Sequence, residues 1–350
     1  MNASNFGVVQ RDDTMRRAME AIDESGLQMV AVIDRRRQLC GVITDSDVRR
    51  AILKGMSTEA LAEDLMNKDP IVGALDQSTE DLISVMRAKR LHGVPIVDSQ
   101  RQFIEIKLLR NLEEPNKLSN RVVLMAGGLG TRLRPLTATT PKPLLKVGEK
   151  PIIQTQIERM RDAGFRHFYI SVNYRGDMIK NFFEDGASFG VEISYLEEDE
   201  RAGTAGALSL IEESLVDPLI VMNGDLLTKV DFNGLLEYHR AHRALATMCV
   251  KEYRYEVPFG VVETDEEKII KISEKPIHEF FINAGIYALN AEVLTTIPAA
   301  TFYDMPHLFE NLIKQDKNAC AFPIIEYWAD IGTESDFELA NKDYQLNFLN

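Results

Sequence analysis

The stretch that most constrains the fold is "VVLMAGGLG", residues 122–130, in which four apolar residues run directly into three glycines. The apolar run predicts a buried strand, and the glycines predict a loop at its carboxyl end. Further along, apolar runs such as "HFYISVN" and "LIVMNGD" alternate with helical patterns such as "IIQTQIERMRDAG". This alternation predicts an α/β fold with a mostly parallel, Rossmann-like sheet, whose ligand lies at the carboxyl ends of the strands.

The glycine loop has the chemistry of an anion site. Gly127, Gly128 and Gly130 allow backbone N–H groups to point at a phosphate chain or a nucleobase. The loop is not a P-loop, because no Lys-Ser/Thr closes it, and it lacks the third glycine of a dinucleotide fingerprint. Of the basic residues that follow, Arg132 offers phosphate oxygens a planar fork and Lys142 offers a mobile point charge.

The whole motif, Gly-Gly-x-Gly-Thr-Arg-Leu-x-Pro-Leu-Thr followed by Pro-Lys-Pro-Leu, resembles the sugar-1-phosphate nucleotidylyltransferase family. The resemblance runs from about Arg121 to the C-terminus and implies a GT-A-like catalytic domain. It implies that Arg132 and Lys142 hold the triphosphate and the departing pyrophosphate. It also implies that Ala126, Thr131 and the three glycines contact the nucleotide.

Two aspartates match the family's magnesium ligands. Asp225 ends the run "VMNGD", and Asp330 lies in "WADIGT". Hard carboxylate oxygens suit Mg²⁺, which keeps several waters and takes other ligands from substrate phosphates. The resemblance therefore implies a Mg²⁺ cofactor held by Asp225 and Asp330.

A third group of residues matches the sugar end of the family's site. In "SEKP", the resemblance implies that Lys275 binds the phosphate of the sugar-1-phosphate and that Glu274 binds a sugar hydroxyl. Gly260 of "PFGVV" and Asn283 of "INAG" are implied to line the sugar. On composition alone, Glu274 and Lys275 would be an ordinary solvated charge pair.

The segment "LEEDERAGTAGAL" resembles the family's nucleobase loop, with Glu198, Gly203 and Thr204 as the implied contacts. An ionised glutamate only accepts hydrogen bonds, and guanine presents two adjacent donors whereas uracil and thymine present one. We therefore expect GTP, with UTP or dTTP as the alternative. A solvated acidic rim is the structural alternative for Glu198.

The first part of the chain contains an internal repeat. "MVAVIDRRRQLCGVITDSDVRRAIL" overlays "HGVPIVDSQRQFIEIKLLRNL", and each copy is preceded by a helical stretch, residues 14–25 and 78–90. The pattern resembles a tandem pair of CBS domains, an α+β ligand-sensing module. We expect this module at residues 1–114, with repeats at about 1–58 and 59–114. A linker at 115–120 and the catalytic domain at 121–350 follow.

The first repeat keeps the family's nucleotide motif, while "FIEIKLLR" in the second has lost it. The resemblance implies that Thr44 and Asp47 bind an adenine nucleotide. The alternative is that they form the capping box of a helix.

The combination of paired CBS domains and a guanylyltransferase-like domain resembles the glucosamine-1-phosphate guanylyltransferases of bacterial legionaminic acid biosynthesis. It implies GTP and glucosamine-1-phosphate as substrates, with mannose-1-phosphate or a heptose-1-phosphate as alternatives. A CTP-dependent transfer to phosphocholine is less favoured. A different class of function is a nucleotide-sensing module with an inactive transferase domain.

Composition limits the kinds of binding partner that we expect. A net charge of −14 and a pI near 5.0 argue against binding to nucleic acid. No apolar run is long enough for a bilayer, and the first ten residues do not resemble a signal peptide, so we expect a cytoplasmic protein. The three cysteines are far apart and fit free thiols in a reducing compartment. Because paired CBS modules often associate through their helices, we expect a homo-oligomer.

Overall fold

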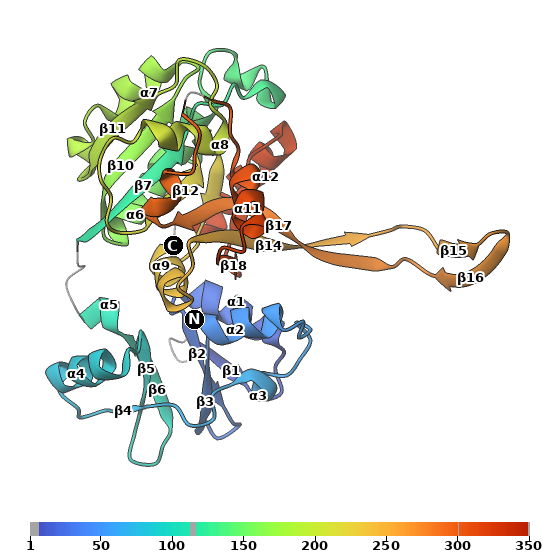
Figure 1. Ribbon diagram of the computed structural model, residues 1–350. Helices are drawn as coiled ribbons and strands as arrows, with labels where there is room; N and C mark the ends of the chain where they lie inside the picture. The colour runs from blue at the N-terminus through green and yellow to red at the C-terminus, as the bar shows by residue number, and fades with distance from the viewer. Residues whose placement is uncertain (1–6, 113–116, 300, 349–350) are drawn as a thin grey trace.

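The computed structural model describes residues 7–112, 117–299 and 301–348 (Figure 1). Its centre is a seven-stranded sheet with the order β11-β10-β7-β12-β17-β14-β18. Strand β17 runs antiparallel to both of its neighbours, and the remaining pairs are parallel. The strands are β7 (Leu118–Met125), β10 (Phe165–Val172), β11 (Glu192–Glu197), β12 (Leu219–Asn223), β14 (Ala246–Glu256), β17 (Ile277–Leu289) and β18 (Ala319–Pro323).

Both faces of this sheet are covered, as its apolar strands require. In β7, Val122 and Leu124 face one buried cluster, and Val123 faces another. Helices α6 (Ile152–Asp162), α7 (Gly176–Phe183) and α9 (Phe232–Ala241) cover the first face. Helices α8 (Gly203–Gly206), α10 (Ala291–Leu294) and α11 (Met305–Lys314) cover the second. The predicted α/β fold class with a mostly parallel sheet is confirmed.

Smaller elements gather near the carboxyl end of β7. Leu133, Leu227 and Tyr344 share a third buried cluster, which anchors the segment after the glycine loop. The elements are the 3₁₀ turns η2 (Thr131–Leu133), η3 (Leu136–Ala138) and η4 (Lys142–Leu144), the pairs β8 (Lys146–Val147) with β9 (Lys150–Pro151) and β13 (Leu226–Thr228) with β19 (Trp328–Asp330), and α12 (Glu334–Asn347). The turns η5 (Ala187–Phe189) and η6 (Ala207–Leu210) precede β11 and follow α8.

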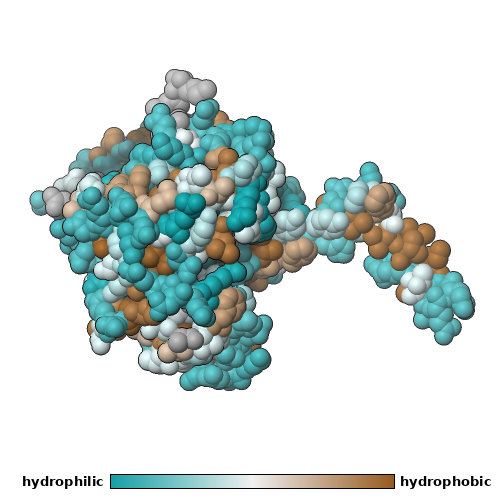
Figure 2. Space-filling view, turned by 90° about the horizontal axis from the view of Figure 1, so that it is seen from above, coloured by the Kyte–Doolittle hydropathy of each residue, from teal (hydrophilic) through white to brown (hydrophobic). Residues whose placement is uncertain are grey.

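A long two-stranded arm projects from the sheet (Figure 1). Strands β14 and β17 continue beyond the body, and β15 (Val261–Asp265) with β16 (Lys268–Ser273) form the tip. Figure 2 shows apolar side chains along the arm, and Ile269 and Ile272 at the tip are 62% and 64% exposed. Residues 257–260 and 274–276 interrupt the ladder between base and tip.

The N-terminal module consists of two similar halves, as the repeat predicts. Each half is a three-stranded sheet, β1-β2-β3 or β4-β5-β6, whose first pair is parallel and second pair antiparallel. The elements are β1 (Val8–Gln10), α1 (Met15–Ser25), β2 (Met29–Ile33), β3 (Leu39–Thr44), α2 (Asp45–Leu53), α3 (Ala62–Leu65), β4 (Gly73–Ala74), α4 (Thr79–Lys89), β5 (Gly93–Val97), β6 (Phe103–Leu108) and α5 (Leu109–Leu112).

The two halves are joined directly. The amide of Leu39 donates to the carbonyl of Arg101 at 3.1 Å, and the amide of Phe103 donates to the carbonyl of Arg37 at 2.9 Å. Leu39 and Phe103 also share one buried apolar cluster. Each half therefore covers apolar surface that the other leaves open.

The module also contacts the transferase domain. His92 of the second repeat pairs with Glu237 of α9 at 2.8 Å, and Gln28 of the first repeat donates to Asp231 just before that helix. Strand β7 begins at Leu118, within the segment 115–120 that we expected to be a linker, while residues 113–116 lie outside the described residues. Within the described residues, no helix is long and apolar enough to cross a membrane.

Candidate active site

The glycine loop lies at the carboxyl end of β7, as expected. Gly130 has φ +61°, and a Cβ there would lie 3.3 Å from the Cβ of Lys142 and 2.9 Å from Cγ2 of Thr137. The Thr137 hydroxyl donates to the Gly130 carbonyl at 2.7 Å. Glycine is therefore required where Lys142 approaches the loop.

Lys142 and the two predicted metal ligands form one cluster. The Lys142 Nζ lies 2.5 Å from Oδ2 of Asp225 and 4.0 Å from Oδ1 of Asp330, and the lysine is 8% exposed. The two aspartates are brought together by strand pairing, since Leu226 of β13 lies opposite Asp330 of β19. The side chain of Arg132 is exposed. It lies near the aspartates, since a Cβ placed on Gly332 would be 3.8 Å from Nη1 of Arg132 and 3.8 Å from Oδ2 of Asp330.

The donor atoms of this cluster fit a magnesium ion. Oδ1 of Asp225 and Oδ1 of Asn223 are buried and accept no hydrogen bond from any described residue. Burial raises the pKa of Asp330, and the Asp225 carboxylate raises it further, while Lys142 and Arg132 oppose the shift. A divalent cation would relieve both the unpaired oxygen and the repulsion between carboxylates. The described residues hold no cluster of three or more His, Cys, Asp or Glu side chains arranged for a metal.

Glu198 lies beside the glycine loop rather than on a solvated rim. A Cβ on Gly127 would lie 2.9 Å from Oε1 of Glu198. The Ser171 hydroxyl donates to Oε1, and the amide of Ala202 donates to Oε2 at 2.9 Å. These bonds fix the carboxylate against the backbone of the loop. The role of Glu198 in binding a base stays a prediction.

The neighbouring Gly203 and Thr204 have a structural task. Gly203 has φ +82°, and a Cβ there would lie 2.6 Å from the Tyr303 carbonyl oxygen. The amide and hydroxyl of Thr204 both donate to Oδ1 of Asp304, at 2.8 and 3.1 Å. The Thr204 hydroxyl also accepts from the amide of Met305 at 2.9 Å. Thr204 thus ties α8 to the start of α11.

The residues predicted to bind the sugar-1-phosphate lie in two places. Asn283 lies near the cluster, since Met222 pairs with Ile286 and a Cβ on Gly285 would lie 2.7 Å from Nδ2 of Asn223. The side-chain amide of Asn283 is hydrogen-bonded to the Tyr287 hydroxyl, and its Oδ1 accepts from the backbone amide of Gly285.

The other three predicted sugar residues lie on the arm. Gly260 and Glu274 face each other, with 2.9 Å between a Cβ placed on Gly260 and Oε2 of Glu274. Lys275, which has φ +45°, is exposed at the break in the ladder. It lies eight positions before Asn283, which is on the order of 25 Å along an extended strand. The structure therefore does not bring Glu274, Lys275 and Gly260 to the aspartates.

In the N-terminal module, Thr44 and Asp47 form the capping box of α2. The Thr44 hydroxyl accepts from the Asp47 amide at 3.3 Å, and Oδ2 of Asp47 accepts from the Thr44 amide at 3.0 Å. The structural alternative is therefore present, and an adenine nucleotide at these residues stays a prediction.

Sequence reasoning gave no role to Asn223, whose unpaired oxygen lies beside the cluster. Its place at the end of β12, two positions before Asp225, was the available signal. It also gave no role to Arg49 and Glu326, which carried no motif and meet across the two domains.

Comparison with known proteins agrees with this geometry. Residues 121–347 match the nucleotidyl transferase family, and residues 3–54 and 62–106 match the CBS domain. A probable mannose-1-phosphate guanylyltransferase of Oryza sativa subsp. japonica is 35% identical over 228 residues, 62% of each chain. A mannose-1-phosphate guanyltransferase of Candida albicans is 36% identical over 225 residues, 61% of this chain and 62% of the other. The chain thus spans about 62% of the length of these curated relatives.

Solved structures give the same picture. A putative glucose-1-phosphate thymidylyltransferase from Bacillus anthracis matches with TM-score 0.54 and 26% identity, covering 66% of this chain and 97% of that one. HddC from Yersinia pseudotuberculosis, complexed with GMP-PN, matches with TM-score 0.50 and 25% identity, covering 64% and 99%. The fold, the glycine loop with its lysine and aspartates, and the match over residues 121–347 agree, and the chain belongs to the nucleotidyl transferase family, with tandem CBS domains at its N-terminus.

Proposed function

We propose that the protein transfers GMP from GTP to the phosphate of a hexose-1-phosphate, giving a GDP-sugar and pyrophosphate. The observation that carries the proposal is the cluster of Lys142, Asp225 and Asp330 beyond the glycine loop. A cation and two carboxylates in this arrangement suit a site that binds a metal–triphosphate. The inactive-domain alternative is disfavoured, because a degenerate site loses such ligands.

In the proposed reaction, an oxygen of the sugar phosphate attacks the α-phosphorus of GTP. The new bond joins this oxygen to phosphorus, and the bond from the α-phosphorus to the bridging oxygen breaks as pyrophosphate leaves. The attacking oxygen is already an anion, so no general base is needed, and positioning with charge neutralisation supplies the rate. Bound Mg²⁺ would neutralise phosphate charge.

Each residue of the cluster, together with Arg132, has a role in the proposed reaction. Asp225 and Asp330 would hold the metal, and the buried Oδ1 of Asp225 is available for it. Lys142, which pairs with Asp225 here, would exchange that carboxylate for the oxygens of the leaving pyrophosphate. Arg132, being exposed at the loop, would bind the triphosphate with its planar fork.

The choice of GTP is supported by Glu198, which only accepts hydrogen bonds and is fixed beside Gly127. The names of the guanylyltransferase relatives support it as well. For the sugar, we propose glucosamine-1-phosphate, on the resemblance carried by the combined CBS and transferase domains. Mannose-1-phosphate is the second candidate, because it is the substrate named for the relatives.

The test is pyrophosphate release by the full chain with Mg²⁺. Each of GTP, UTP, dTTP, CTP and ATP is paired with glucosamine-1-phosphate, mannose-1-phosphate, a heptose-1-phosphate and phosphocholine. We expect release with GTP and glucosamine-1-phosphate, and mass spectrometry should identify GDP-glucosamine. A pyrimidine preference would contradict the guanine assignment, and no release with any pair would contradict the proposed function.

A further inference from the structure

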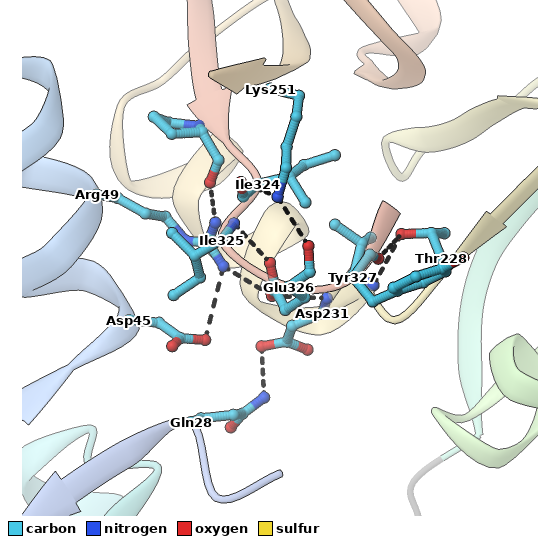
Figure 3. A network of polar contacts seen from close by, with 12 residues as sticks. Gln28, Asp45, Arg49, Thr228, Asp231, Lys251, Ile324, Ile325, Glu326 and Tyr327 are labelled. Atoms are coloured by element: carbon cyan, nitrogen blue, oxygen red, sulfur yellow. Dashed lines mark hydrogen bonds and ion pairs between the residues drawn. The ribbon is translucent and has the colours of Figure 1, made fainter. Parts of the chain in front are cut away.

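A short segment of the transferase domain packs against the N-terminal module (Figure 3). Residues 322–326 comprise the last two residues of β18 and the start of its connection to β19. Within this segment, Ile325 belongs to the apolar cluster of the first CBS repeat. Arg49 of α2 donates to the Pro323 carbonyl and, through Nη2, to Oε1 of Glu326 at 2.9 Å. Its guanidinium also lies 3.8 Å from the ring centroid of Phe322.

This ion pair is buried between the two domains. Arg49 is 3% exposed and Glu326 is 7% exposed. Burial alone would raise the pKa of Glu326, but the Arg49 guanidinium and backbone amides hold it below its ordinary value. The Asp231 amide donates to Oε1 at 3.2 Å, and the Ile325 amide donates to Oε2 at 3.0 Å. Arg49 also pairs with Asp45 of its own helix at 3.6 Å. Its pairing with Glu326, in contrast, exists only while the two domains stay docked.

The same segment leads directly to Asp330 and thus to its cluster with Lys142 and Asp225. Asp330 lies four residues after Glu326, at the end of β19. The Tyr327 carbonyl between them accepts from the Thr228 hydroxyl and the Lys229 amide, both at 2.9 Å. The Nζ of Lys251 donates to the Glu326 carbonyl at 3.0 Å. The backbone from Glu326 to Asp330 is therefore held on successive residues, beginning with a contact to another domain.

We propose that Arg49 is a positioning residue for the transferase site, which fixes Glu326 from the N-terminal module and thereby sets the position of the Asp330 carboxylate. The inference rests on the proposed function in one respect, because it gives Asp330 a part in binding the divalent cation. Arg49 is not part of the cluster of Lys142, Asp225 and Asp330. It acts through the Phe322–Glu326 segment and β19, as groups behind a metal ligand do.

The test compares Arg49→Gln with Arg50→Gln in the full chain. Arg50 is the matched control, because it follows Arg49 on α2 but its side chain is 62% exposed. Mn²⁺ is titrated in the presence of GTP without acceptor, and free Mn²⁺ is read by electron paramagnetic resonance. We expect the Mn²⁺ dissociation constant to rise ~10-fold in Arg49→Gln and to stay unchanged in Arg50→Gln.

Two further readouts separate positioning from a merely structural role. Amide hydrogen exchange over residues 323–330 should be faster in Arg49→Gln than in Arg50→Gln, without any metal present. The Mg²⁺ concentration for half-maximal turnover should rise ~10-fold, while the KM for GTP at saturating Mg²⁺ stays within about 2-fold. Arg49→Lys, which keeps the charge but loses the fork, should lie between wild type and Arg49→Gln.

An unchanged Mn²⁺ affinity in a folded Arg49→Gln protein, with only a lower Tm, would overturn the inference. Arg49 would then only stabilise the contact between the two domains. If Arg49→Gln does not fold, Arg49→Lys carries the same comparison, and wild-type Mn²⁺ affinity in it would overturn the inference. A wild-type protein that binds Mn²⁺ and GTP but releases no pyrophosphate would contradict the proposed function alone. The binding comparison would still decide the role of Arg49.

Discussion

The edge around Asp225 and the projecting arm belong to the same domain but are held in different ways. At the edge, Lys142 is buried, and two strand pairs fix the aspartates relative to the glycine loop. The arm is held by its own ladder, and Lys275 lies where that ladder is interrupted. Two strands alone are marginally stable in water. On the proposed function, the end of the site that would bind the nucleotide is preformed, whereas the residues proposed for the sugar are only partly assembled.

The largest effect should come from the preformed edge. Asp225→Asn removes a charge from the cluster, and we expect kcat to fall about 10²- to 10³-fold with the fold retained. Asp265→Asn, an exposed carboxylate at the arm tip, is the control and should be silent. Steady-state pyrophosphate release and circular dichroism measure the two quantities. Near-normal turnover of Asp225→Asn would contradict a catalytic role for the cluster around Asp225.

The arm gives the next largest expected effect. If the arm bends at its interrupted ladder to reach the sugar phosphate, Lys275→Ala loses a charged hydrogen bond. We then expect the KM for the sugar phosphate to rise ~10- to 100-fold, with the KM for GTP unchanged. Lys271→Ala is the control, because Lys271 pairs with Glu263 on the arm at 2.9 Å. Equal KM values for the two variants would place the sugar end at Asn283 without the arm.

Base choice should respond more weakly. Glu198→Gln keeps the shape of the side chain but replaces one acceptor oxygen with a donor amide. We expect the preference for GTP over UTP, measured as the ratio of kcat/KM values, to fall ~10-fold. Glu197→Gln is the neighbouring control, since Glu197 pairs with Lys180 at 2.7 Å away from the loop. An unchanged ratio would return Glu198 to a structural role.

The smallest effect should arise at the contact between the second repeat and α9. A hydrogen bond to Glu237 raises the pKa of His92 above 6.5. Because the folded-state pKa is the higher one, this contact contributes fully below pH 6.5 and is lost as the pH rises through the raised pKa. Both side chains are about half exposed, so we expect less than about 1 kcal/mol. Thermal melts of wild type and His92→Ala should differ at pH 6 and converge at pH 9.

Local patterns explain which parts could be predicted from the sequence. The helical stretch expected at residues 14–25 of the repeat is present as α1 (Met15–Ser25), which follows an N-cap at Thr14 whose hydroxyl accepts from the Arg17 amide. The strand before the glycine loop was predicted from its own run of apolar residues. Such a run can be recognised from neighbouring residues alone. The cluster of Lys142 with Asp225 and Asp330 was expected from a resemblance, and β13 and β19 supply its geometry.

Long-range contacts explain what was missed. Arg49 and Glu326 are 277 positions apart, and neither stands in a pattern that indicates a buried partner. The motif containing Lys275 predicted a sugar contact, but the register of β14 with β17 carries that residue outward. Such pairings depend on the whole fold, so spacing along the chain does not indicate them.

The separation between Arg49 and Glu326 also bears on how the chain is made. The ribosome synthesises α2 long before Glu326, which supplies the partner carboxylate, and domains generally fold as they emerge. During that interval the guanidinium must stay hydrated at the surface of a half-finished protein. The first repeat can therefore reach its final packing only after Glu326 has been synthesised and has docked against it.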